Sequence, residues 1–194
     1  MAFASLKVKV QGQGFDVFQD AAKALGSENK ANRALSRAIN HTGSKAFTGT
    51  KRALAKQTGL TQKKLVDKGG VKKQRARTNR LQYEIFSSGS ALSLKEFGAK
   101  QFRFGVKAKP WGETQKFESA FIFTGTPKSG NPFAGGHAFI RTSGSSFPVR
   151  KMFGPAVPTE IVKGESKAAF ESKARGLNDR LAHEVGRMTK GAVS

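Results

Sequence analysis

The chain has 194 residues, of which 35 are lysine or arginine, 13 are aspartate or glutamate and none is cysteine, for a formal net charge of +22. The lack of cysteine excludes disulfides and thiolate metal sites, and no apolar run approaches the ~20 residues of a membrane span. The first fourteen residues also lack the apolar core of a secretory signal. We therefore expect a protein without a membrane partner, made in the cytoplasm or carried inside a particle.

The positive charge is concentrated in one segment. Residues 44–80 hold twelve basic residues and one acid, Asp67, so this segment alone carries +11 of the +22. A field of this size favours polyanions, which means nucleic acid, an acidic lumen or an acidic protein surface. A basic but inert soluble surface is the alternative.

The first part of the chain predicts a strand followed by helices. Residues 6–10 alternate apolar side chains with lysines, which is the period of a half-buried strand, and residues 15–26 have a short helical pattern. Ser27 is a suitable N-cap for a long helix, and Gly59 is a typical residue just beyond a helix C-terminus.

Two glycines interrupt the pattern of this long helix. Gly43 and Gly49 each weaken a helix by up to about 1 kcal/mol relative to alanine, so a kink near one of them is compatible with the sequence. After the helix ends, Thr61 is placed to cap a short third helix over residues 62–68.

The middle of the chain predicts strands. Residues 71–78 and 81–89 have the pattern of a hairpin, and residues 117–125 and 136–144 form a second predicted pair. Residues 103–112 are a further predicted strand. Because these strands follow one another with short connections, we expect a largely antiparallel arrangement.

The end of the chain returns to helix. Residues 164–190 are predicted as one amphipathic helix because apolar residues recur at intervals of three and four, namely Phe170, Ala174, Leu177, Leu181, Val185 and Met188. The predicted fold class is therefore α+β, with an N-terminal strand and helices packed on a largely antiparallel sheet and a C-terminal amphipathic helix. We expect a single domain over 1–194, divided into an N-terminal strand or arm (1–14), a helical part (15–68), a β-rich part (71–158) and the C-terminal helix (164–190).

No catalytic constellation is evident. His41, His137 and His183 are far apart and lack the spacing of a metal site, and the carboxylates are scattered. Residues 125–131 have the glycine spacing of a phosphate loop but lack the Lys-Ser/Thr pair that such a loop needs. We expect no enzyme, no cofactor and no metal.

Nucleic-acid recognition motifs are also missing. Lys72, Lys73, Arg75 and Arg77 are candidates for contacts with DNA phosphates, which need no reading of bases. Few aromatic residues lie among them, which argues against a stacking platform for single strands.

Two stretches carry a family resemblance. "ALSLKEFGAKQFRFGVKAKPWG" (91–112) and "HAFIRTSGSSFPVRKMFGPAVP" (137–158), with a weaker third piece at 34–65, resemble the minor tail protein Z family of long-tailed, lambda-like bacteriophages and their prophages. The matching positions are Leu94, Lys95, Phe97, Gly98, Lys107, Pro110, Trp111, Phe139, Arg141, Pro148, Arg150, Gly154, Pro155 and Pro158.

The resemblance implies a structural tail-completion protein of the head–tail neck, found in the virion at the head-proximal end of the tail and in the host cytoplasm during assembly. It implies a homo-oligomeric ring, with a hexamer expected from the usual symmetry of tails, and tail-terminator, tail-tube or head-connector proteins as partners. Non-specific contact with genomic DNA is a further expectation. The candidate partner-interface residues are Lys95, Phe97, Lys107, Pro110, Trp111, Arg141, Pro148, Arg150, Lys151, Phe153 and Pro155.

The segment 147–158 is expected to be a stiff, basic corner. Its three prolines fix φ and pre-order the chain, and Gly154 is expected to permit a turn. The alternative is a corner that only closes the domain core. For the whole chain, the second hypothesis is a basic nucleic-acid-binding protein of ribosomal or nucleoid type, which salt-dependent retention on DNA would favour.

Overall fold

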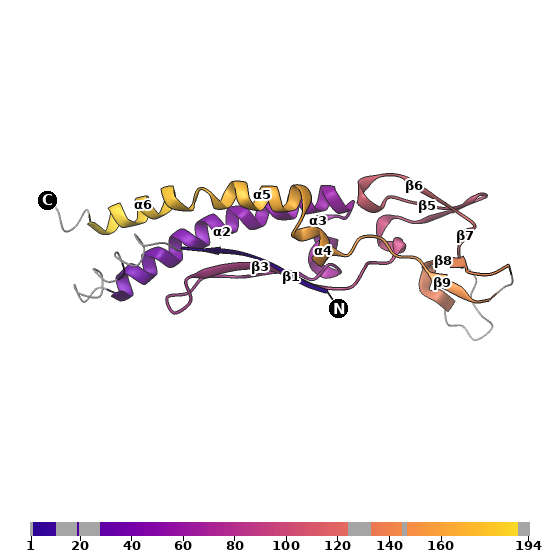
Figure 1. Ribbon diagram of the computed structural model, residues 1–194, viewed down its shortest axis with the longest axis horizontal. Coiled ribbons are helices and arrows are strands. Elements are labelled where there is room, and N and C mark those ends of the chain that lie inside the picture. Colours follow the sequence, from indigo (N-terminus) through magenta and orange to yellow (C-terminus); the bar gives the residue numbers. More distant parts are fainter. Residues whose placement is uncertain (1, 11–18, 20–27, 124–132, 145–146, 190–194) are drawn as a thin grey trace.

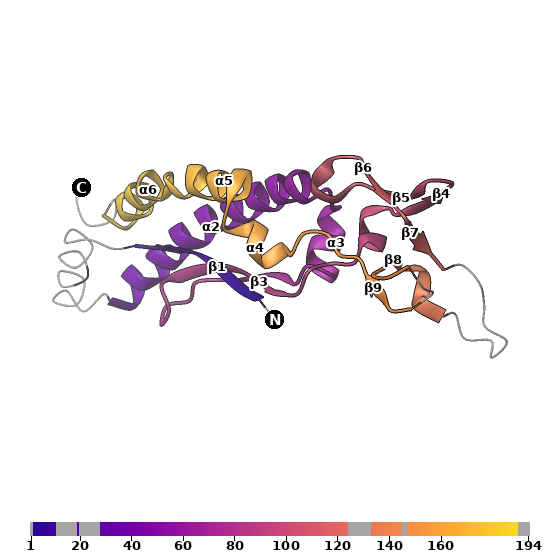
Figure 2. The same ribbon diagram turned by 45° about the vertical axis from the view of Figure 1, so that its right-hand side comes forward.

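The computed structural model of the chain describes residues 2–10, 19, 28–123, 133–144 and 147–189. These residues form an elongated molecule with helices along one half and small sheets at the other end, as Figures 1 and 2 show.

The α+β class is confirmed. The helices are α2 Glu28–Thr58, α3 Gln62–Asp67, α4 Val157–Ile161, α5 Gly164–Ala174 and α6 Leu177–Thr189, with short 3-10 turns η1 Leu94–Phe97, η2 Pro110–Gly112 and η3 Phe133–Gly136. The strands are β1 Ala2–Lys9, β2 Val71–Gln74, β3 Gln82–Gly89, β4 Lys100–Phe102, β5 Gly105–Ala108, β6 Gln115–Glu118, β7 Ala120–Ile122, β8 Ala138–Arg141 and β9 Val149–Lys151.

Helix α2 is the central element of the helical half. It packs against α5 and α6 on one side and against the β1–β3 part of a three-stranded sheet on the other (Figure 1). The helix is unbroken from Glu28 to Thr58, so the glycines at 43 and 49 introduce no break, and it ends at Gly59, whose φ of 75° is the left-handed conformation expected there. The predicted cap of the next helix is confirmed, because the Thr61 hydroxyl accepts from the Lys64 amide.

Gly43 is required by the close approach of strand β3. A Cβ atom at Gly43 would lie 2.3 Å from Cγ of Tyr83, which is fully buried on β3. A Cβ atom at Gly49 would instead make an ordinary contact of 3.5 Å with Cγ of Lys173 on α5. The two glycines therefore face different layers, and only the first is fixed by packing.

The first sheet confirms the predicted hairpin. Its strand order is β1-β3-β2, with β3 central and both pairings antiparallel. Val8 lies opposite Tyr83, and Val71 lies opposite Ser87, so the buried side of β3 faces the helices. The alternation that the sequence shows over residues 81–85 is thus a real one-sided burial pattern.

The β-rich end differs from the prediction. The strand predicted over 117–125 is divided at Ser119, which has a φ of 60°. As a result β6 pairs with β5, whereas β7 pairs with β8, and the sheet predicted as one is three separate three-stranded antiparallel sheets. A left-handed residue turns the chain between two short strands, and periodicity alone does not reveal it.

The C-terminal helix is likewise divided. Helix α5 ends at Ala174 and α6 begins at Leu177, while a short helix that the sequence did not predict, α4, precedes both. Phe170 and Leu177 are buried as predicted, and Leu181 is half-buried. Three predictions fall outside the described residues: the side chains of Val185 and Met188, the helix over 15–26 apart from Gln19, and the cap Ser27.

The two glycines of α2 give a matched pair of variants. We expect Gly43→Ala to lower the free energy of unfolding by about 1–3 kcal/mol, because the new methyl group overlaps the Tyr83 ring. We expect Gly49→Ala to be neutral or stabilising by up to about 1 kcal/mol, because it improves helix propensity without a clash. Urea denaturation of both variants measures this, and equal effects would contradict the packing described here.

Candidate functional site

Three polar side chains of α2 hydrogen-bond to the elements packed around it, namely α4 and α5, the β2–β3 hairpin and α6. These bonds set the surface between the elements. The first is Gln57. Its Nε2 donates to the carbonyl oxygen (3.1 Å) and to Oε2 (2.8 Å) of Glu160, and its Oε1 accepts from the amide (3.1 Å) and hydroxyl (2.8 Å) of Ser166. Glu160 and Ser166 are buried, so their polar groups need partners within the protein; this amide serves both residues, and Lys163 also pairs with Oε1 of Glu160 at 2.9 Å. Gln57 therefore holds α4 and the start of α5 against α2.

The second is Asn40, which holds the hairpin. Its Nδ2 donates to the carbonyl oxygen of Ala76, and its Oδ1 accepts from the amide of Ala76, both at 2.9 Å. The buried Ala76 stands between Arg75 and Arg77. The paired hydrogen bonds therefore fix the position of both arginines relative to α2.

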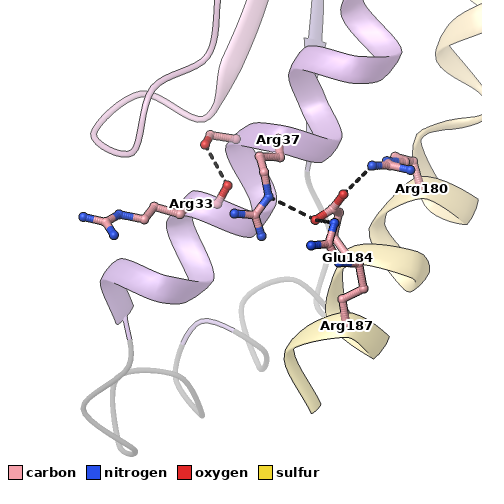
Figure 3. A network of polar contacts seen from close by, with 6 residues as sticks. Arg33, Arg37, Arg180, Glu184 and Arg187 are labelled. Carbon is pink, nitrogen blue, oxygen red and sulfur yellow. Dashed lines mark hydrogen bonds and ion pairs between the residues drawn. The ribbon is translucent and has the colours of Figure 1, made fainter. Parts of the chain in front are cut away.

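The third is Arg37, which takes part in a cluster around the buried Glu184 of α6 (Figure 3). The Glu184 carboxylate accepts from Arg37 Nε at 3.1 Å and from Arg180 Nη2 at 2.5 Å, and Arg187 Nη1 lies 4.0 Å away. Burial by itself raises the pKa of Glu184, but the hydrogen bond from Arg37 and the charges of Arg180, Arg37 and Arg187 outweigh it, so its pKa is lowered. Arg33 points away from the cluster in Figure 3.

Between these fastened elements lies a hollow of about 740 Å³, which we name the basic groove. Helix α2 forms its floor, the segment after β2 forms one wall and α5 forms the other. Its lining residues are Asn40, His41, Ser44, Lys45, Thr48, Gly49, Arg52, Arg75 and Lys173.

The charges of the basic groove are uncompensated. Lys45, Arg52, Arg75 and Lys173 are exposed, and no carboxylate of the described residues lies within ion-pair distance of any of them. The pKa of His41 is lowered by partial burial and by the charges of Arg180 and Lys45. The groove is thus a site of positive potential.

The four DNA-contact candidates are all exposed, but they do not act as one set. Arg75 lines the basic groove, and Lys73 and Arg77 line an adjoining hollow with Arg80. Lys73 also lies 4.8 Å from the centroid of the Phe47 ring. Lys72 lines neither hollow.

Lys45, Arg52 and Lys173 were not among the residues predicted from the sequence to contact DNA. Lys45 and Arg52 are seven residues apart on one helix, so helical periodicity places them on the same face and was a usable signal. Lys173 reaches the groove only because α5 folds back along α2, and no local pattern shows this.

At the β-rich end, the structure corrects three of the partner-interface candidates. Phe97, Pro110 and Pro155 are buried, so they offer no surface to a partner in this conformation. Phe97 packs under Gly154, Pro110 packs in η2 against the end of α2, and the carbonyl of Pro155 accepts from the Leu92 amide at 3.3 Å. Of the other candidates, Lys107 and Lys151 are half-buried, and the exposed ones are Lys95, Trp111, Arg141, Pro148, Arg150 and Phe153.

The sequence predicts Trp111 at the end of a strand, and the structure does not place it there. It lies in η2 with a φ of 56° and is 44% exposed. Its side chain hydrogen-bonds Glu160 and contributes to the lowered pKa of that carboxyl, after the larger effects of burial, which raises it, and of Gln57 and Lys163, which lower it. The indole is therefore tied to the helical body.

The two stretches 91–112 and 137–158 interlock. Leu94 N donates to Met152 O at 3.1 Å, and Gly154 N donates to Leu92 O at 2.7 Å. A Cβ atom at Gly154 would lie 2.6 Å from Cε2 of Phe97, so this glycine is needed for ring packing and not, as expected, for a special backbone angle. The corner at 147–158 is in part an edge strand, β9, and its last two residues begin α4.

This end also exposes phenylalanine rings that make cation–π contacts with lysine side chains. Phe102 and Phe104 stack at 5.5 Å between centroids, with Lys107 Nζ 5.8 Å from the first ring and Lys116 Nζ 5.5 Å from the second. Phe153 is 53% exposed with Lys151 Nζ 5.6 Å from its ring. We name Phe102, Phe104 and Phe153 with these lysines the aromatic end; such rings are typical anchors of protein interfaces.

One contact has the residue types of a catalytic pair. Ser93 Oγ and His137 Nδ1 lie 2.7 Å apart, and the pKa of His137 is lowered by burial and by Lys151 and Lys95. A working pair also needs a third group that orients the imidazole through Nε2, and no described residue hydrogen-bonds that atom. Among the described residues no group of three or more His, Cys, Asp or Glu side chains is placed to hold a metal ion.

Comparison with known proteins returns no match to a family model, to a curated protein or to a solved structure. Within the described ranges, each helix is too short or too polar to cross a bilayer.

The Glu184 cluster predicts a pH-dependent contribution to stability. We expect Glu184→Gln to lower the free energy of unfolding at pH 7 by about 1.5–3 kcal/mol, because it weakens hydrogen bonds made with a charged, buried group. Since the folded pKa of Glu184 is below its ordinary 4.5, the stabilisation is complete above pH 4.5 and is lost as pH falls through the folded value.

Urea denaturation at pH 7 and in acid measures the difference between wild type and variant, which should shrink in acid. Glu171→Gln is the matched control: this exposed carboxylate of α5 pairs with Lys167 at 3.8 Å and should change stability by less than about 0.5 kcal/mol. A difference for Glu184→Gln that stays constant with pH would contradict the assignment.

Proposed function

We propose that the chain is a structural tail-completion protein of a long-tailed bacteriophage or prophage, which acts at the head-proximal end of the tail. The observation that carries the proposal is the interlock of 91–112 with 137–158, since these separate stretches, on which the resemblance rests, build one unit with cation-bearing aromatic rings on its surface. The third stretch joins the same unit, because Lys64 donates to the Glu96 carbonyl at 2.5 Å.

In this role the aromatic end is the contact with a neighbouring protein. Exposed phenylalanines provide apolar anchors, and the lysines beside them favour an acidic partner surface. Ring neighbours, a tail terminator, a tail tube and a head connector are the partners to test. A homo-oligomeric ring, with six copies expected, requires two different patches on each subunit, and the elongated shape offers two dissimilar ends (Figure 2).

The second candidate function is a basic nucleic-acid-binding protein of ribosomal or nucleoid type. The uncompensated cations of the basic groove favour it. The two candidates differ in what they require of the aromatic end, which a nucleoid protein does not need for its activity.

The basic corner gives the test of tail completion. In cells carrying a phage that lacks this gene, we expect Arg150→Ala with Lys151→Ala to reduce infectious particles about tenfold or more, because the partner contact loses two charges and the cation over Phe153. The control, Lys167→Ala with Arg175→Ala, removes the same charges from exposed positions in α5 and just after its last residue, and it should support normal yields.

Both proteins must fold equally well by circular dichroism. If the corner variant gave wild-type yields, the corner would not be the contact site. If the phage that lacks this gene still produced complete tails without any complementing protein, the proposed function itself would be wrong.

A further inference from the structure

The basic groove is the centre of a longer basic strip. It shares Arg75 with the hollow next to the hairpin, and it shares His41, Lys45 and Lys173 with a second hollow that runs toward α6. Six cations of the strip have no ion-pair partner among the described residues, namely Lys45, Arg52, Lys73, Arg75, Arg77 and Lys173. They come from three separate elements, α2, the β2–β3 hairpin and α5.

The fold keeps these cations in place and keeps carboxylates away. Asn40 fixes the hairpin that carries Arg75 and Arg77, and Gln57 holds the start of α5 against α2, so that Lys173 lies over the groove. The nearby acids pair with other cations: Glu84 pairs with Arg80 and Lys7, and Glu184 pairs with Arg37 and Arg180. Arg80 and Arg180 line the two ends of the strip, so these pairs leave the six cations named above uncompensated. Among the described residues, Asp179 at the α6 end is the one carboxylate that lines the strip.

The lining chemistry selects the class of partner. A stable interface with an acidic protein needs apolar or large aromatic anchors at its centre, and the residues lining the basic groove include no Phe, Tyr, Trp or branched apolar residue. Its uncharged members include Ser44, whose hydroxyl, with the cations, is a group that contacts phosphate oxygens in nucleic-acid complexes, whereas the Thr48 hydroxyl donates to the Ser44 carbonyl within α2. The composition thus fits a phosphate backbone better than a protein surface.

The same lining distinguishes duplex from single strand. Binding of single strands without sequence preference relies on aromatic side chains that stack on bases. The rings that line the strip are the imidazoles of His41 and His183. The nearby Phe47 ring is only partly exposed and is covered by Lys51 and Lys73, whose Nζ atoms lie 5.6 and 4.8 Å from its centroid. The described residues therefore present no uncovered phenylalanine, tyrosine or tryptophan ring along the strip.

We propose that the basic groove binds double-stranded DNA through its phosphate backbone, without reading the base sequence. The site consists of Lys45, Arg52, Arg75 and Lys173, with Lys73 and Arg77 extending it along the hairpin. The inference concerns the isolated chain and does not depend on a role in tails.

Fluorescence anisotropy with a labelled 25-base-pair duplex of arbitrary sequence tests this proposal. With six phosphate contacts, we expect the logarithm of the association constant to fall with the logarithm of salt concentration with a slope of about −5. The variant Lys45→Gln, Arg52→Gln, Lys173→Gln should make the slope shallower by about 3 and raise Kd about tenfold or more at 100 mM salt.

The matched control is Lys100→Gln, Arg103→Gln, Lys109→Gln, which removes two lysines and one arginine from exposed positions of the β-rich end. It lowers the net charge equally, so we expect less than a threefold change in Kd and an unchanged slope. All six positions are exposed, and circular dichroism checks that both variants fold.

Four outcomes would overturn the proposal: no binding of duplex by wild type at 50 mM salt, equal losses in the two triple variants, tighter binding of a single strand of the same length, or equally tight binding of a polyglutamate of matched charge. The last would point to an acidic protein. If DNA binding behaves as expected but the tail-completion test fails, only the tail proposal is rejected. If the tail-completion test succeeds but DNA binding fails, only the DNA site is rejected.

Discussion

Helix α2 is buried on two opposite faces, and each candidate site takes its position from this constraint. One face meets the sheet so closely that Gly43 leaves room only for the Tyr83 ring. The other meets α5 and α6, where buried polar contacts must be satisfied within the protein. Gln57 and Arg37 satisfy them and thereby set where α5 and α6 lie, while Asn40 sets the position of the hairpin through its hydrogen bonds with Ala76. The basic groove lies over α2, between the hairpin segment and α5, whose positions these hydrogen bonds set.

The distribution of acids follows from the same constraint. With 35 basic and 13 acidic side chains, each carboxylate near the helical body has a strong effect on local potential. Glu160 and Glu184 are buried as structural hydrogen-bond acceptors, so they neutralise cations at the fastenings and not in the groove. The groove cations consequently repel one another, and an anionic ligand that neutralises them relieves this repulsion.

The two ends of the molecule present different chemistry. The groove has cations and hydroxyls without apolar anchors, whereas the aromatic end has exposed rings with lysines placed over them. A polyanion with a regular backbone suits the first, and a folded protein with an acidic surface suits the second. Two unlike surfaces on a long, fastened body are compatible with a component that joins two parts of an assembly.

The sequence by itself determined the α+β class, the long helix to Gly59, the hairpin of β2 and β3 and the excess of positive charge, because these depend on local periodicity, capping and composition. It also indicated Arg75 and Arg150 as candidate contact residues, and both are exposed. Only the tertiary structure decided that Phe97, Pro110 and Pro155 are buried, that one predicted strand is shared between two sheets at Ser119, and that Lys173 joins Lys45 and Arg52 across α2. These features depend on contacts between residues distant in the chain, and a local pattern contains no information about which faces meet.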